Sequence, residues 1–490
     1  MPDGALVRQT MKRSRRQEQY LANYSYRWKV AGLLISCGLF LSVRSSAQAV
    51  PPLDDEYREA AGRLIGAAMV DMAGWEKLTY LTTTVGHRLS GTPALDRAVE
   101  WVAQQMRSDG LENVRTQPVK VPRWSRGAES ARIVSPVQRP LGMLGLGGSI
   151  GTPKHGIVAS VVVVGSFDEL DRLGTDTVRG KIVLFDMPWQ SYNETVRYRR
   201  NGASQAAKRG AVASLVRSVT PRSLYTPHTG AMNYDTSAPL IPAAAITVED
   251  AAWIRRATRM GEDVRVHLTM EAATGPDADS ANVIGEIVGR ELPDEIVVLG
   301  GHIDSWDVGQ GAHDDGVGIL SAWQAVTLMK RLGLKPRRTI RVVAWTNEEN
   351  GGRGSAAYRA SLGTDVGKHV AAIEMDSGAE RPLGFGFAIR GLPDTDARVV
   401  NAVRVLREIA RLLEAIGTNT IGPGGGGADI EPLMVDGVPG LGLQTVGEHY
   451  FDWHHTNADT LDKVDLQDFR RCMATMAVMA YVLADMPGRL

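Results

Sequence analysis

The chain has 490 residues, which is too long for one ordinary domain and predicts two or three. With 43% hydrophobic and 22% charged residues it can build sizeable cores, so a disordered chain is excluded. Residues 1–49 hold eight bases and two acids, a net of +6, and the rest holds 47 bases and 53 acids, a net of −6. A mildly acidic body predicts no nucleic-acid partner.

The first 49 residues have the pattern of a signal peptide. Basic residues precede Val30–Val43, fourteen residues without a charge, and Ala47-Gln48-Ala49 offers a cleavage site. The apolar run is short for a membrane span. We expect export to the periplasm or the medium, without stable membrane insertion after cleavage. An uncleaved anchor, lipidation at Cys37 and twin-arginine export at Arg15-Arg16 are the weaker alternatives.

Cysteine usage fits this expectation. Cys37 and Cys472 are the only cysteines, and cleavage leaves Cys472 alone, so no intrachain disulfide can form. Cys472 lies in an apolar helical run, which is typical of a buried, unreactive thiol.

Residues 50–123 are predicted to form the first part of a discontinuous domain. A helix is expected over residues 54–81. A second helix begins at Thr92-Pro93 and ends at Gly110, with an apolar face at helical spacing made of Leu95, Ala98, Val99, Val102 and Met106. A strand over residues 114–121 ends at Pro122.

Residues 124–268 change in character and are predicted to form a separate β-rich module, inserted into the surrounding fold. Glycine, proline and short β runs dominate. The runs are residues 158–165, 181–185, 211–216, 243–247 and 264–270, with helices expected over 201–209 and 249–259.

Residues 269–490 alternate between strand and helix patterns. Strands are expected over 295–300, 338–346, 369–375 and 440–445, and helices over 316–332, 355–362, 399–416 and 465–484. Such alternation predicts an α/β fold: a mostly parallel central sheet with helices on both faces, carrying the β-rich insert.

Residues of metal-ligand type follow the predicted strands. His302 and Asp304 close the first strand, Glu348 and Glu349 the second, and Asp376 the third, while His454 and His455 follow the last loops. The carboxyl ends of parallel strands share one sheet edge, where α/β folds place their sites. Imidazole and carboxylate together favour zinc. An isolated acid or histidine at a strand end is usually ordinary loop capping, but their coincidence in one sheet favours a site.

Two histidines and three carboxylates can hold two zinc ions if one carboxylate bridges them. Such a pair of ions binds and polarises a hydroxide between them. A further carboxylate, free of metal, must accept the proton of the water. Glu348 and Glu349 are adjacent at a strand end, so one can bind metal while the other faces the substrate.

Four motifs resemble the co-catalytic zinc exopeptidases related to aminopeptidase Y and glutamate carboxypeptidase. They are His302-Ile303-Asp304 continuing to His313-Asp314-Asp315-Gly316, Asn347-Glu348-Glu349-Asn350-Gly351-Gly352, Glu374-Met375-Asp376-Ser377-Gly378 and His454-His455-Thr456. The stretch Ser305–Ala312 looks most like the plasma glutamate carboxypeptidase (carboxypeptidase Q) branch. The resemblance covers nearly all of residues 50–490 and includes Gly86–Thr92, and the insert is similar to a protease-associated domain.

The resemblance implies a role for each site residue. Asp314 would bridge the two ions, His302 and Asp376 would complete one site, and Glu349 and His455 the other. Glu348 would be the general base. Asp304 would orient His302 by accepting its other ring proton, and His454, where many relatives have tyrosine, is a candidate for oxyanion stabilisation. His87, His313 and His449 are expected to be structural.

The expected function is hydrolysis of dipeptides or short peptides by an exported exopeptidase with two Zn²⁺ per chain. The carboxypeptidase or dipeptidase assignment rests on the branch resemblance, and an aminopeptidase is the alternative. A free C-terminus needs a basic partner, for which Arg88, Arg353 and Arg359 are candidates. The glycine-rich run 422–429 is expected to line the substrate cleft, or else to be an ordinary surface loop. A non-catalytic binding protein with the same fold is the alternative from another functional class. For the assembly, we consider a homodimer.

Overall fold

The structure is a computed structural model that describes residues 52–490. The predicted signal peptide and its alternatives lie outside these residues. Among the helices of residues 52–490, none has the length and apolar character needed to cross a bilayer.

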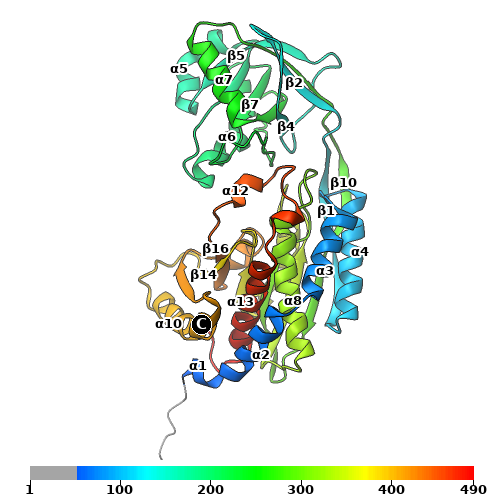
Figure 1. Ribbon diagram of the computed structural model, residues 1–490, viewed down its shortest axis with the longest axis vertical. Coiled ribbons are helices and arrows are strands. Elements are labelled where there is room, and N and C mark those ends of the chain that lie inside the picture. Colours follow the sequence, from blue (N-terminus) through cyan, green and yellow to red (C-terminus); the bar gives the residue numbers. More distant parts are fainter. Residues whose placement is uncertain (1–51) are drawn as a thin grey trace, which may run out of the picture. The chain divides into compact units, whose positions relative to one another are not determined.

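Two eight-stranded sheets organise this part of the chain (Figure 1). The first has, in spatial order, β1 (Glu112–Ser125), β10 (Ala273–Ile287), β12 (Arg338–Trp345), β11 (Leu292–His302), β13 (His369–Glu374), β16 (Gly440–Thr445), β14 (Pro382–Ala388) and β15 (Thr420–Pro423). The four strands β12, β11, β13 and β16 run parallel, as predicted. Antiparallel pairs flank them, β1 with β10 and β10 with β12 on one side and β16 with β14 on the other.

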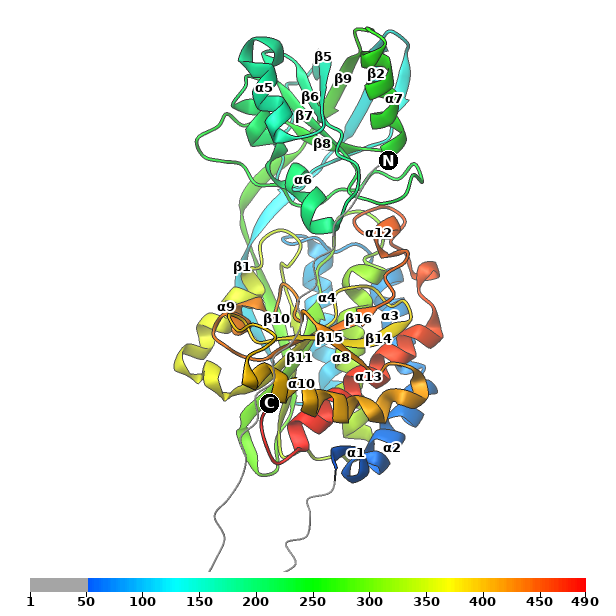
Figure 2. The same ribbon diagram turned by 90° about the vertical axis from the view of Figure 1, so that its left-hand side faces the viewer.

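Alternate residues of β11 point to different cores, because side chains along a strand alternate between faces. Val297 and Leu299 belong to the larger core, and Ile296 and Val298 to a smaller one on the opposite face. The larger core takes in α2 (Arg58–Met69), α3 (Ala73–Tyr80), α4 (Pro93–Ser108), α8 (Val317–Arg331), α10 (Ala397–Ala410) and α13 (Leu466–Asp485). The smaller core takes in α9 (Arg353–Leu362) and α11 (Glu431–Val435). Helices therefore cover both faces, as predicted (Figure 2).

The helix predicted over residues 54–81 is wrong as a single element. The chain forms α1 (Leu53–Glu56), α2, α3 and a π-helical turn η1 (Leu81–Val85). The carboxylate of Asp71 accepts the amide of Gly74 at 2.7 Å. Aspartate favours such caps over helix interiors, because its side chain competes for the backbone amides. This contact lies at the start of α3, one residue before its N-cap Met72, and favours the break from α2.

Helix α4 confirms its prediction. Thr92 is the N-cap, Pro93 holds the first helical position, and the predicted apolar face is buried. The following strand β1 is longer than predicted, because it continues past Pro122 to Ser125 and pairs along its length with β10. The sequence did not indicate β10, whose first half is exposed and lacks a periodic apolar pattern.

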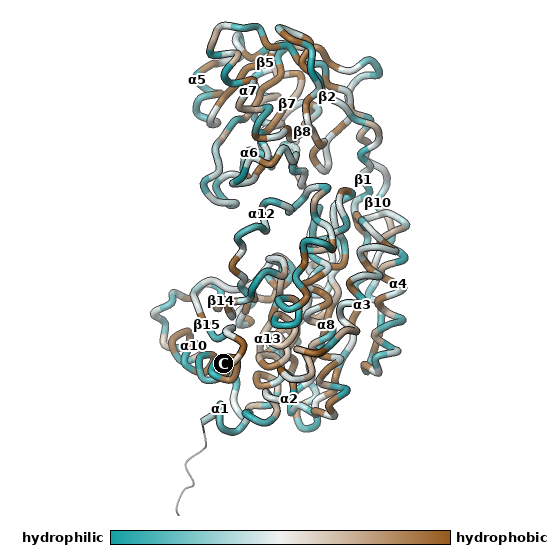
Figure 3. The backbone as a smooth tube through the Cα atoms, viewed as in Figure 1, coloured by the Kyte–Doolittle hydropathy of each residue, from teal (hydrophilic) through white to brown (hydrophobic). Residues whose placement is uncertain are grey.

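The second sheet has the order β3 (Arg139–Leu141), β2 (Glu129–Ser135), β9 (Arg265–Met270), β5 (Ile157–Val164), β6 (Ile182–Phe185), β7 (Ala213–Arg217), β8 (Ala243–Ile246) and β4 (Met143–Gly145). The predicted β runs are strands β5 to β9. Two helices, α6 (Tyr192–Ala207) and α7 (Val248–Arg259), occur near their predicted places, and α5 (Phe167–Val178) was not predicted. Apolar stretches mark the inner strands of both sheets, and polar stretches mark the loops (Figure 3).

Candidate active site

The side chains predicted to bind metal come together at one edge of the first sheet. His302 is the last residue of β11, Glu349 follows the end of β12, and Asp376 follows the end of β13. Asp314 comes from the turn η2 (Ala312–Gly316) before α8, and His455 from the loop after α12 (Tyr450–Trp453). Because β11, β12 and β13 are parallel, their carboxyl ends meet at this edge.

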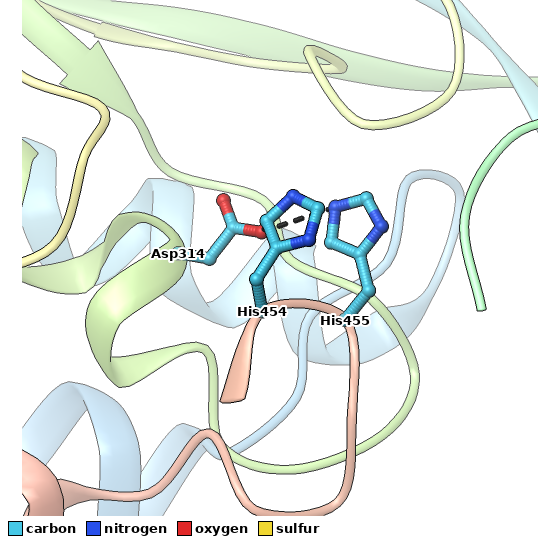
Figure 4. Close-up of side chains that lie close together, drawn as sticks. All are labelled: Asp314, His454 and His455. Atoms are coloured by element: carbon cyan, nitrogen blue, oxygen red, sulfur yellow. Dashed lines mark ion pairs between the residues drawn. The ribbon is translucent and has the colours of Figure 1, made fainter. Parts of the chain in front are cut away.

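Asp314 lies between two groups of these side chains. Its Oδ1 is 3.2 Å from Nε2 of His302, and that nitrogen is 3.7 Å from Oδ1 of Asp376. Its Oδ2 is 3.1 Å from Nε2 of His455, and that nitrogen is 3.1 Å from Oε2 of Glu349. Figure 4 shows the carboxylate of Asp314 turned toward the two neighbouring imidazole rings of His454 and His455. Each carboxylate oxygen therefore faces a different imidazole–carboxylate group.

The donor atoms fit a metal centre. Nε2 of His302, Oδ2 of Asp314 and Oδ1 of Asp376 are buried and have no hydrogen-bond partner among the described residues. Buried polar atoms are otherwise almost always paired. Donor atoms lie within 4.8 Å of one another in each of three overlapping triads, and their imidazole nitrogens and carboxylate oxygens suit zinc. The triads are Asp314 with His454 and His455, His302 with Asp314 and Glu349, and His302 with Asp315 and Asp376.

Glu348 and Glu349 differ in what they contact, although they are neighbours. Besides facing His455, Glu349 accepts the amide of Trp306 through Oε1 at 3.2 Å. Glu348 lines the cavity above the cluster and makes no side-chain ion pair with the described residues. Burial, reinforced by the carboxylates of Asp376 and Asp314, raises the pKa of Glu348 to about 8 when no cation is present.

The backbone of Asp304, rather than its carboxylate, orients His302. Nδ1 of His302 lies 2.9 Å from the carbonyl oxygen of Asp304 and 3.8 Å from its carboxylate. A carbonyl only accepts, so Nδ1 carries the proton and Nε2 presents its lone pair to the cluster. The carboxylate of Asp304 instead accepts the amides of Glu348 at 3.1 Å and Glu349 at 3.4 Å. The expected carboxylate contact to His302 is corrected accordingly, and Asp304 supports both strand-end loops.

Asp459 positions Asp314, and sequence reasoning missed it. Its carboxylate accepts the amides of Ala312 at 3.1 Å, His313 at 2.7 Å and Asp314 at 3.2 Å. Burial raises its pKa to about 7, because the amides and Arg88 only partly offset the loss of water and the charge of Asp314. An acid four residues after His455 is no signal by itself, since solvated acids are common in loops.

The remaining histidines take separate places. The ring of His454 stacks on that of His455, with centroids 3.5 Å apart, and its Nε2 lies 3.7 Å from Oδ2 of Asp314. Burial lowers the pKa of His454 well below its ordinary value, which favours a neutral ring. His313 accepts the amide of Ala379, and His449 contacts Asp452, so both have structural partners.

A segment of the second-sheet region is hydrogen-bonded to the histidine loop. The amide of Thr229 donates to the carbonyl of His455 at 3.0 Å, and the Thr229 carbonyl lies 3.3 Å from Nδ1 of His455. Nδ1 of His228 donates to the carbonyl of His454 at 2.8 Å. The tautomer that donates from Nδ1 to this carbonyl leaves Nε2 of His455 for the cluster, as in His302. Residues outside the first sheet thus help to fix one side of the site.

A cavity of about 620 Å³ opens over the cluster. Asp314, Glu348, Glu349 and Asp376 lie on its floor. Its walls come from both sheet regions and include Arg123, Tyr192, Arg199, Arg200, Tyr450 and Phe451. A volume of this size is typical of a small-ligand site.

None of the three arginines proposed for a substrate carboxylate lines the cavity over the cluster. Arg88 is fully buried and donates to the backbone carbonyls of Ile303, Gln310 and Gly311, so it braces the loop before Asp314. Arg353 pairs with Asp277 at 2.5 Å, and Arg359 pairs with Asp436. Local sequence could not place these side chains, because their partners are distant in the chain.

The glycine-rich run packs against the site. The amides of Asp429 and Ile430 donate to Glu374 at 3.3 and 2.9 Å. A Cβ at Gly427 would overlap the same carboxylate, so a side chain there would displace it. Ala428 lies on the wall of the cavity.

The comparisons with known proteins agree with this geometry. The family model described as peptidase family M28 matches residues 282–480. Carboxypeptidase Q of Bos taurus is 43% identical over 437 residues, which is 89% of this chain and 90% of the bovine protein. The crystal structure of a peptidase M28 precursor from Shewanella amazonensis has a TM-score of 0.84 at 33% identity, covering 89% of this chain and 98% of that one. An aminopeptidase from Aneurinibacillus sp. shares the fold, with a TM-score of 0.63 at 22% identity over 88% of this chain and 97% of its own.

The fold and the histidine–carboxylate cluster define a metallopeptidase of the zinc exopeptidase class. More specifically, the chain belongs to peptidase family M28, and its extended similarity is to carboxypeptidase Q.

Proposed function

We propose that the cluster holds two zinc ions bridged by Asp314. His302 and Asp376 would complete the first site, and Glu349 and His455 the second. The observation that carries this proposal is the placement of Asp314, whose two oxygens face different imidazoles at 3.2 and 3.1 Å. A carboxylate held in this way can bind two ions at once. The buried donor atoms around it that have no hydrogen-bond partner among the described residues favour such a role.

Within this proposal, Glu348 is the general base for peptide hydrolysis. Bound zinc would supply Lewis acidity, which polarises the scissile carbonyl and makes water more acidic. Glu348 faces the cavity without a fixed partner, so its carboxylate is free to accept the proton of the attacking water and return it to the leaving amine. His454 is the candidate for stabilising the oxyanion, because its neutral ring can donate one N–H beside Asp314.

We further propose dipeptides or short peptides as substrates, cleaved at the C-terminal residue by an exported enzyme. The similarity to carboxypeptidase Q over most of both chains supports this choice, and the cavity accommodates a ligand of two or three residues. We also propose a division into peptidase parts 50–123 and 269–490 and a protease-associated-like insert 124–268. The confinement of the second sheet to β2 through β9 supports this division, although β1 extends past residue 123 to Ser125 and β9 extends past residue 268 to Met270.

Hydrolysis of a dipeptide panel with free and blocked N-termini tests the function. Cleavage that survives N-terminal acetylation supports carboxypeptidase action. Cleavage that requires the free amine supports aminopeptidase action instead. Absence of hydrolysis by zinc-loaded protein in every case leaves a binding protein on the same fold as the explanation.

A further inference from the structure

Arg199 lies in α6, in the second-sheet region, and its guanidinium is buried beside the metal-ligand cluster. The residue is only 2% exposed. Nη1 donates to the carbonyl of Thr229 at 3.2 Å and lies 3.3 Å from Nδ1 of His455, while Nη2 donates to the hydroxyl of Tyr192 at 3.0 Å. Nε has no hydrogen-bond partner among residues 52–490.

The surroundings of Arg199 lack a counter-ion of their own. Each of these contacts is neutral, and no carboxylate of the described residues forms an ion pair with this guanidinium. Burying a charge without a partner is unfavourable, and native structures rarely keep such a group unless something else pairs with it. The nearby cluster carboxylates, Asp314 and Glu349, contact Nε2 of His455, on the other side of the ring from Arg199.

The chain makes room for this guanidinium. A Cβ at Gly230 would overlap the guanidinium carbon of Arg199, so only glycine permits the approach. Gly230 adopts φ of 136°, a conformation that side chains disfavour. Tyr192 holds the other end of the fork, and its ring lies under the guanidinium. The fork is therefore held in one place, while Arg123 and Arg200, on the same cavity, are exposed.

We propose that Arg199 binds the terminal carboxylate of the peptide substrate. This inference rests on the proposed exopeptidase function and names the group that limits cleavage to the chain end. A planar guanidinium matches a carboxylate through paired hydrogen bonds, and burial strengthens the attraction. One imidazole ring, that of His455, separates Arg199 from the cluster. One residue spans about 3.5 Å, so a carboxylate one residue beyond the scissile carbonyl lies within reach.

The two exposed arginines provide the contrast. The side chains of Arg123 and Arg200 are solvated and can rotate freely. Holding a ligand would therefore cost them more conformational entropy and gain less electrostatic free energy. They contribute to the potential of the cavity and do not select for a terminal carboxylate.

The experiment compares a neutral dipeptide with its C-terminal amide in the zinc-loaded, full-length protein and its variants. Wild type should lose about 10- to 100-fold in kcat/KM on amidation, since a buried charged hydrogen-bond partner is lost. Arg199→Met should lose a similar factor on the free dipeptide and show almost no further loss on amidation. Arg199→Lys should recover part of the preference, because it keeps the charge but not the fork. Arg123→Met and Arg200→Met, the matched controls, should keep the wild-type preference.

Two results would overturn the proposal. One is a wild type that cleaves the dipeptide and its amide equally well. The other is an Arg199→Met protein that loses zinc or loses both substrates to the same extent, because Arg199 would then only brace His455.

A binding measurement keeps the proposal testable if the proposed peptidase function itself fails. Calorimetric titration with leucine and with leucinamide should show binding of the acid alone to wild type and of neither to Arg199→Met. Equal affinity of wild type for both compounds would refute carboxylate recognition, whatever the hydrolysis panel shows.

Discussion

Replacement of Glu348 by glutamine separates proton transfer from metal binding. Glutamine has nearly the same shape, and the carboxylate that it replaces forms no ion pair with the described residues, so the substitution removes only the ability to accept a proton. General-base help is worth about 10²–10⁴-fold, which sets the expected loss in kcat. Because burial raises the pKa of Glu348 to about 8, its charge does not stabilise the metal-free fold at neutral pH. The thermal midpoint of metal-free Glu348→Gln should therefore equal or exceed that of wild type.

The matched variant is Glu349→Gln, one residue along. Its carboxylate lies 3.1 Å from Nε2 of His455, so an amide there should weaken zinc binding at that side of Asp314. Zinc content by mass spectrometry and kcat on a dipeptide, measured on both proteins, provide the assay. Loss of zinc from Glu348→Gln together with full zinc in Glu349→Gln would show that the two roles are exchanged.

Further predictions concern the bridging carboxylate of Asp314, the loop that carries His454 and His455, the pH profile and the stability of the fold. Asp314→Ala should bind neither zinc ion, and retention of one would show that Asp314 does not bridge. His228→Phe removes the donor to the carbonyl of His454, so zinc affinity should fall by about tenfold, while Thr226→Val, which removes only the contact to Nε2 of His228 and leaves that donor in place, should have a smaller effect. The acid limb of kcat/KM should lie below pH 8, because bound cations stabilise the Glu348 carboxylate and lower its pKa from about 8; an activity that rises only above that pH would contradict the assignment. Asp465 accepts the amides of Gln467 and Asp468 at the start of α13, so Asp465→Ala should lower the free energy of unfolding by about 1 kcal/mol, whereas Gln467→Ala should change it little.

Much of the fold could be predicted because its signals are local. The alternation after residue 281 placed β11, β12, β13 and β16, and the cap at Thr92 placed α4. Strand β10 could not be predicted, since its exposed half carries no apolar period and owes its conformation to pairing with β1. The break between α2 and α3 depends on a hydrogen bond from the amide of Gly74 to the side chain of Asp71, and helix propensity alone does not predict that contact.

The site was predictable for a different reason. Its ligand-type residues stand at strand ends, so parallel topology brings His302, Glu349 and Asp376 together. The supporting residues were not predictable, because Asp459, Thr229 and Arg199 reach the site through contacts distant in sequence. The same limitation explains why Arg88 was one of three candidates for the substrate carboxylate, since no local pattern indicates that its side chain is buried under backbone carbonyls.

The pairing of β1 with β10 has a consequence for how the chain folds. The last residue of β1, Ser125, pairs with the first residue of β10, Ala273, so the chain leaves the first sheet and returns to it at the same point. Closing a loop costs entropy that grows with its length. Once the second sheet has formed, the two ends of this loop are already close. The pairing of β1 with β10 then costs no more entropy than the closing of a short loop. Folding of the first sheet thus becomes faster when the intervening residues fold early, and a slow or damaged second sheet delays the pairing of β1 with β10.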